Sequence, residues 1–188
     1  MNYPFETERL VFRPFEPGDL QNFQAYLNSP ELAGRRYIPW KFPTDIPMSK
    51  IQVEGVLKTW AEAENQLHLA IILREDSNLI GHVNASWGWD PHCPNLDLVI
   101  SPTYQRQGYG SEVLTAMLAY FFNNTPAHNI TGGMTSWNQQ ALDFAAKQGF
   151  TSNGRFRRAG FRDGQYMDWV GMEILRPEWI DLSQKGGA

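Results

Sequence analysis

The chain has 188 residues, of which 42% are hydrophobic and 19% charged, a balance that can build one sizeable core and excludes a disordered chain. Its formal net charge of -4 supplies no general attraction for a polyanion, so no nucleic-acid partner is expected. The single cysteine, Cys93, excludes an internal disulfide and a multi-thiolate metal site, and no metal is expected.

The first third of the chain predicts one strand, one helix and a long loop. Residues 7–13 alternate as an edge strand does, and Pro14 ends them because proline lacks the amide that a sheet needs. A helix is expected from Asp19 to about Leu27. Residues 29–47 hold four prolines among aromatic residues, which predicts an ordered aromatic loop without regular structure.

The middle of the chain predicts a helix followed by a meander of strands. Ser49 can cap a helix that runs to about Glu64. The periodicity then changes to that of strands over residues 67–73 and 79–87, and the alternation of Leu96, Leu98 and Ile100 predicts a third strand. Residues 1–12 lack a leader pattern and no apolar run could cross a bilayer, so we expect a cytoplasmic protein without a membrane partner.

The last part predicts alternating helices and strands. A helix over residues 111–122, a strand over 130–134 and a helix over 138–148 with Gly149 as its stop precede two long strands that turn at 162–165. We expect a single domain over residues 1–183 and a loose tail over 184–188. The order β-α-α-β-β-β-α-β-α-β-β predicts an α/β fold around a mixed sheet.

The most informative segment, residues 105–111, lies between a strand and a helix. Its glycines allow successive amides to turn inward, and the start of the following helix attracts anions, so the segment predicts a pyrophosphate site. Arg106 either adds a charge-assisted contact or is a solvated surface residue. A Walker loop is excluded because no lysine follows Gly110, and a dinucleotide fingerprint because residue 113 is valine.

Gln105, Gly108 and Gly110 form Gln-x-x-Gly-x-Gly, which resembles the coenzyme A signature of the GCN5-related N-acetyltransferase (GNAT) family. Residues 96–102 resemble the family strand that pairs with the pantetheine arm, and residues 138–141 with 147–150 resemble its second motif. Residues 6–14 and 162–168 resemble the RimJ/RimL-like branch, which includes ribosomal-protein N-terminal acetyltransferases. Each glycine could also be an ordinary turn or helix stop, and Asn138 an ordinary helix cap.

The resemblance implies a mixed, mostly antiparallel central sheet with helices on both faces. It also implies acetyl-coenzyme A as cosubstrate and direct attack by an amine without a covalent enzyme intermediate. A backbone amide near Val99 would then polarise the thioester carbonyl. The implied cofactor contacts are Leu98, Val99, Ile100, Gln105, Arg106, Gln107, Gly108, Tyr109, Gly110, Ser111 and Asn138.

The general acid and base are less well indicated. Many relatives place a tyrosine on the helix after the asparagine motif, and the matching residue here is Ala145. Asp97 and His82 are the substitute candidates, with a structural role as the alternative for each. The missing tyrosine also motivates a second hypothesis, a non-catalytic acyl-coenzyme A-binding or sensor module.

The acceptor is expected to be a primary amine, either a protein N-terminus or a small molecule. By resemblance, the aromatic loop and the final hairpin line its pocket, which makes Tyr37, Trp40 and Phe42 candidate acceptor contacts or, alternatively, packing residues. Their rings suit a cationic or apolar amine. A homodimer is a further expectation.

Overall fold

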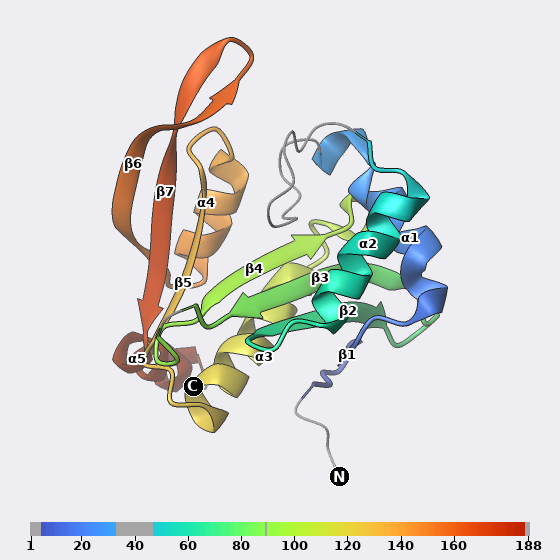
Figure 1. The fold of residues 1–188 in the computed structure, drawn as a ribbon. Coiled ribbons are helices and arrows are strands. Elements are labelled where there is room, and N and C mark those ends of the chain that lie inside the picture. Colours follow the sequence, from blue (N-terminus) through green and yellow to red (C-terminus); the bar gives the residue numbers. More distant parts are fainter. Residues whose placement is uncertain (1–4, 33–46, 89, 187–188) are drawn as a thin grey trace. The chain divides into compact units, whose positions relative to one another are not determined.

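Residues 5–32, 47–88 and 90–186 are described by a computed structural model of the chain (Figure 1). They fold as two compact units. The first unit combines Met1–Ser86 with Asp97–Met117, and the second combines Trp87–Leu96 with Leu118–Ala188.

The described strands form a 7-stranded sheet in the order β1-β2-β3-β4-β5-β7-β6. All strand pairs with a described register are antiparallel except β4–β5, which is parallel. The strands are β1 Leu10–Arg13, β2 Gln66–Leu73, β3 Leu79–Ser86, β4 Asn95–Ile100, β5 Asn129–Thr135, β6 Thr151–Arg162 and β7 Gln165–Leu175. The α-helices are α1 Leu20–Leu27, α2 Lys50–Ala61, α3 Tyr109–Asn124, α4 Gln139–Lys147 and α5 Arg176–Gly186. The predicted mixed, mostly antiparallel α/β fold is confirmed.

The first unit is built on the predicted meander. Strands β2 and β3 pair with Leu69 opposite Val83, and β1 pairs with β2 at the sheet edge. Helices α1 and α2 lie in front of these strands in Figure 1 and the start of α3 lies behind them. The core between the sheet and the first two helices includes Phe23, Tyr26, Leu27, Val53, Val56, Trp60, Ala70, Ile72, Leu79 and Val99.

Helix α2 begins where its cap was predicted. The Ser49 hydroxyl accepts the N–H of Gln52 at 3.3 Å, and the Gln52 side chain accepts the N–H of Ser49 at 2.8 Å. This reciprocal pair satisfies two amides that the helix leaves unbonded. The helix ends at Ala61, earlier than the predicted Glu64.

The second unit contains the β5–β7–β6 sheet, α4 and α5. Helix α4 begins after Asn138 and is followed by Gly149, whose φ of +91 is a left-handed conformation that favours glycine. The final hairpin turns at Asp163 and Gly164, which have φ of 50 and 76. Two successive positive φ values are typical of the turn that matches the twist of a hairpin.

Helix α5 corrects the prediction of a loose tail over residues 184–188. It follows β7 directly and includes residues 184–186, while 187–188 lie outside the described residues. The Arg176 guanidinium donates to the carbonyls of Thr125 and Phe122, and the Trp179 ring lies 5.3 Å from the Phe122 ring. Pro177 is compatible with the helix because the first turn needs no amide donor.

In the described part of the chain, no helix has the length and apolar character that crossing a membrane requires. The same residues bring together no group of three or more histidine, cysteine or acidic side chains that could hold a metal ion.

Candidate active site

Residues 101–108 connect β4 to α3 through a loop that its own side chains fix. The backbone N–H of Ser101 donates to the Ile80 carbonyl of β3 at 2.8 Å. The Gln105 side chain then donates to the Ile100 carbonyl at 2.8 Å, and the Gln107 side chain to the Thr103 carbonyl at 3.0 Å. The first glutamine of the motif therefore ties the loop to the end of β4.

Helix α3 begins at Tyr109 rather than at the predicted Ser111, so Gly110 lies in its first turn. The loop reaches the helix through two left-handed residues, Arg106 with φ of 63 and Gly108 with φ of 85. The N–H of Glu112 bonds the Gly108 carbonyl at 3.1 Å. The N–H groups that precede it in an α-helix have no intrahelical acceptor and lie at the positive end of the dipole, which suits a diphosphate.

Arg9 and Glu112 form an anchor that sequence reasoning did not identify. The Arg9 Nε donates to Glu112 Oε2 at 2.7 Å, and its Nη2 lies 2.6 Å from the same oxygen. The other carboxylate oxygen accepts the Thr7 hydroxyl at 2.5 Å and the backbone N–H of Arg9 at 3.1 Å. This four-contact carboxylate ties the segment before β1 to the first turns of α3. In the sequence, Thr7 and Arg9 stood out only as part of the predicted edge strand over residues 7–13 and of the branch resemblance.

The same arginine also supports the glycine loop. Its Nη1 donates to the Gln107 carbonyl at 3.1 Å, and its Cζ lies 4.4 Å from the centre of the Tyr109 ring. A Cβ on Gly108 would lie 3.3 Å from Arg9 Nη2. A guanidinium that is 42% exposed therefore stands beside the predicted phosphate site, where it can add a charge-assisted contact. Arg106 is exposed on the same loop, so both interpretations of it remain.

The predicted pantetheine strand, β4, is held close to β3. Val99 and Ile100 are buried, whereas Asp97 and Leu98 are half-buried. Gly81 of β3 permits the approach, because a Cβ there would run into the Val99 carbonyl oxygen. In the second unit the start of β4 pairs with β5 at Asn95 and Thr131.

His82 is enclosed by aromatic rings in the core of the first unit. It is 0% exposed, and its Nδ1 shares a hydrogen bond of 2.7 Å with the Tyr26 hydroxyl. The rings around it belong to Phe15, Phe23, Tyr26 and Trp60, with centroids between 5.4 and 6.5 Å away. This placement favours the structural role, and a catalytic role for His82 or Asp97 stays a prediction.

Tyr26→Phe should lower the free energy of unfolding by about 1–2 kcal/mol, because it removes the partner of a fully buried imidazole nitrogen. Burial and, next, the charge of Asp19 raise the pKa of Tyr26, so its hydroxyl stays protonated and able to share this hydrogen bond. Urea unfolding measures the loss. Tyr166→Phe, at an exposed ring, is the matched control, and equal stability of the two variants would contradict the expectation.

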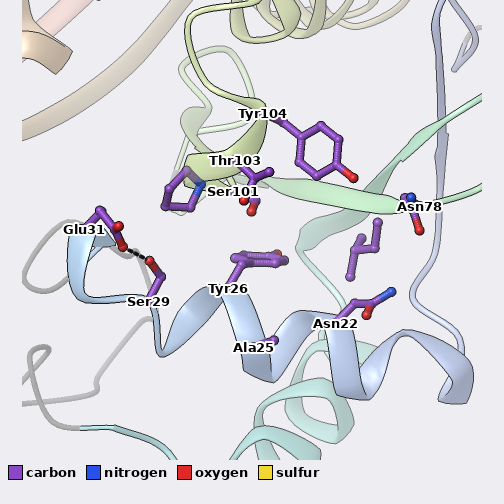
Figure 2. Close-up of a pocket in the computed structure, with 11 residues that line it drawn as sticks. Asn22, Ala25, Tyr26, Ser29, Glu31, Asn78, Ser101, Thr103 and Tyr104 are labelled. Carbon is purple, nitrogen blue, oxygen red and sulfur yellow. Dashed lines mark hydrogen bonds between the residues drawn. The ribbon is translucent and has the colours of Figure 1, made fainter.

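A polar pocket of about 340 Å³ opens beside the segment that leads into the glycine loop (Figure 2). It lies between α1 and the turn Pro102–Tyr104, and Figure 2 shows the Tyr26 ring and Tyr104 on opposite sides of it. Its lining residues are Asn22, Ala25, Tyr26, Ser29, Glu31, Asn78, Leu79, Ser101, Pro102, Thr103 and Tyr104.

Glu31 is the charged residue among those lining the pocket. Its carboxylate accepts a short hydrogen bond from the Ser29 hydroxyl, which is the largest cause of its lowered pKa. The pocket thus presents a carboxylate with hydroxyl and amide groups, a set that suits an ammonium group. The predicted acceptor contacts Tyr37, Trp40 and Phe42 fall in residues 33–46, outside the described residues.

The second motif lies at the start of α4. Asn138 occupies the N-cap position, but its side chain makes no capping hydrogen bond, whereas its backbone N–H donates to the Thr135 carbonyl at 2.9 Å. The helix therefore does not use the Asn138 amide as an ordinary cap, and that amide stays a predicted cofactor contact. Ala145 is buried on the same helix, and this position carries no phenol.

The family is established by sequence comparison. The model of the acetyltransferase (GNAT) domain matches residues 9–151, so the chain belongs to the GNAT family and is an N-acetyltransferase by class. An uncharacterized N-acetyltransferase, YnaD of Bacillus subtilis, is 27% identical over 92% of this chain and 97% of its own length. The [ribosomal protein uS5]-alanine N-acetyltransferase of Escherichia coli is 23% identical over 92% of this chain and 91% of its own length.

Solved structures support the fold. A GNAT-family acetyltransferase from Bacillus anthracis superposes with a TM-score of 0.77 at 22% identity, covering 92% of this chain and 98% of that one. The spermidine N-acetyltransferase of Vibrio cholerae, solved in complex with CoA and spermine, gives 0.76 at 20% identity over 93% and 99%. The relatives thus include an N-acetyltransferase that acts on an alanine of ribosomal protein uS5 and one that acts on spermidine.

Proposed function

We propose that this protein transfers the acetyl group of acetyl-coenzyme A directly to a primary amine, without a covalent enzyme intermediate. The observation that supports this most is the fixed glycine loop at the start of α3, tied to β4 by Gln105 and to the N-terminal segment by Arg9 and Glu112. Backbone amides of that first turn would hold the diphosphate, and Arg9 would add positive charge beside it.

In this reaction the lone pair of the neutral amine attacks the thioester carbonyl carbon and the carbon–sulfur bond breaks. The amine nitrogen loses a proton and the thiolate gains one. A backbone N–H near Val99 would stabilise the oxyanion that forms during the attack. Since residue 145 is alanine, the proton would pass through Asp97 of β4 or through water.

The buried Ala145, which replaces the tyrosine of many relatives, also favours a second candidate, a module that binds acyl-coenzyme A without catalysis. Release of free thiol from acetyl-coenzyme A, measured with N-terminal peptides and small amines, separates the two. An acetyltransferase releases thiol in proportion to the acceptor added. Tight binding of acetyl-coenzyme A without release by any amine in the panel would favour the sensor.

Gly110→Val should weaken coenzyme A binding about tenfold with little change in the melting temperature. The residue lies in the first turn of α3, where valine is tolerated by the backbone but covers the amides that would bind phosphate. Isothermal titration with coenzyme A gives the affinity. Gly55→Ala on α2, where an added Cβ meets nothing within 4 Å, is the control for replacing a glycine away from the predicted phosphate site. Undiminished affinity in folded Gly110→Val would place the diphosphate elsewhere.

A further inference from the structure

Strand β6 is a long, exposed edge of the sheet in the second unit. It spans 12 residues, stands last in the strand order, and is paired with β7 but with no other described strand. Figure 1 shows the tip of the β6–β7 hairpin extending past the start of α4. An edge of this kind presents backbone N–H and C=O groups on its open side, which can pair with an added strand.

The hairpin is positive and aromatic, unlike the chain as a whole. Residues 151–168 hold four arginines and two aspartates, in a chain with a formal net charge of -4. Three of its aromatic rings are among the most exposed large hydrophobic side chains described, at 65–68% exposure. The arginines are Arg155, Arg157, Arg158 and Arg162, and the rings are Phe156, Phe161 and Tyr166.

A bulge in β6 displays two of these arginines. Phe156 pairs with Trp169 and Gly160 with Met167, so residues 157–159 stand opposite Asp168 alone. Arg158 has a φ of 55, and its N–H donates to Asp168 Oδ1 at 2.8 Å. Such bulges bend a strand and redirect its side chains.

Two of the four arginines, Arg155 and Arg162, form ion pairs with aspartates of the hairpin. Arg155 Nε donates to Asp168 Oδ2 at 2.6 Å, and Arg162 lies near Asp163 while its guanidinium stacks 4.0 Å above Trp137. Arg157 and Arg158 lie in the bulge between them. The Arg158 guanidinium is 5.9 Å from the Tyr166 ring, which in turn packs 5.2 Å from the Phe161 ring. Positive charge and apolar surface therefore adjoin at the hairpin tip.

We propose that the open edge of β6 binds an extended acidic segment of a protein acceptor as an added strand, with its carboxylates at Arg157 and Arg158. Phe161 and Tyr166 would contact its apolar side chains. The inference deepens the proposed acetyltransferase function, since it selects a protein over a small amine as acceptor. A polyamine would be repelled by this surface, and a second copy of the same edge would set arginine against arginine.

The same observations disfavour a nucleic acid as the occupant. Affinity for a phosphate chain requires many unpaired cations, whereas two of the arginines here already neighbour aspartates and Asp163 is 88% exposed. An edge strand also offers backbone pairing, which a peptide can satisfy and a nucleic acid cannot.

The test uses peptides that share their first three residues and carry acidic, neutral or basic tails, with binding measured by fluorescence anisotropy and turnover by thiol release. The acidic tail should bind at least tenfold more tightly than the basic tail, and its advantage should fall as salt rises. Replacing alternate tail residues with proline should remove most of the advantage, because proline cannot donate to a strand.

The variant R157E/R158E should reverse the preference for tail charge. K50E/K58E, which reverses two exposed lysines outside the hairpin and changes net charge equally, should keep it. Melting temperature and coenzyme A affinity check that each variant is folded. Equal binding of all tails, or a preference that survives in R157E/R158E, would overturn the proposal. Binding of single-stranded RNA in place of the acidic peptide would overturn it too.

The binding and turnover measurements test the docking surface and the proposed transfer separately. If no amine releases thiol but the acidic peptide still binds through Arg157 and Arg158, the docking surface stands and the proposed transfer does not. If acetyl-coenzyme A releases thiol equally with every peptide and with spermidine as acceptor, the transfer stands and the docking surface is wrong.

Discussion

Gly81→Ala should destabilise the first unit by about 3 kcal/mol. The fraction of the variant that unfolds should show no detectable coenzyme A binding. An added Cβ would overlap the carbonyl oxygen of Val99 and lie 3.1 Å from the Ile100 Cα. Both atoms belong to the backbone of β4, so no side-chain rotation can relieve the clash, and overpacking of this kind is among the severe effects of a single methyl group. Urea unfolding, followed by tryptophan fluorescence, measures the loss.

Gly55→Ala on α2 is the matched control for the same chemical change. No atom lies within 4 Å of its added Cβ, and alanine favours a helix over glycine by about 1 kcal/mol. The two variants should therefore move stability in opposite directions. If Gly81→Ala is as stable as the native protein, β3 and β4 do not approach as closely as described and the strand assigned to the pantetheine arm is misplaced.

Local signals explain what could be predicted from the sequence. The Ser49 cap and the Gly149 stop each depend on a few consecutive residues, and both are found where they were expected. Alternation around Leu98 marked β4 for the same reason. The glycine loop was located as well. The predicted start of α3 was Ser111 instead of Tyr109, because the residues of the first helical turn cannot be told from loop residues in the sequence.

Contacts between distant residues explain what was missed. Arg9 and Glu112 are 103 positions apart, and His82 meets Tyr26 across 56 positions, so no periodic pattern records either pair. Helix α5 depends on Arg176 reaching carbonyls such as that of Thr125, 51 positions earlier. The glycine loop was visible in the sequence, whereas the side chains that hold it in place became apparent only in three dimensions.

Glu112→Gln should lower the free energy of unfolding at pH 7 by about 2 kcal/mol and weaken coenzyme A binding about tenfold, because charge-assisted hydrogen bonds to Thr7 and Arg9 hold the start of α3. Burial acts to raise the pKa of Glu112, but those hydrogen bonds outweigh it and lower the pKa below its ordinary 4.5.

A carboxylate with a lowered pKa stabilises the fold above its ordinary pKa and loses that contribution as the pH falls through the lowered value. The deficit of Glu112→Gln should therefore shrink below pH 4.5 in urea unfolding, while exposed Glu75→Gln shows little deficit at any pH. A deficit that stays constant down to pH 3 would mean that the carboxylate charge is not what anchors the loop.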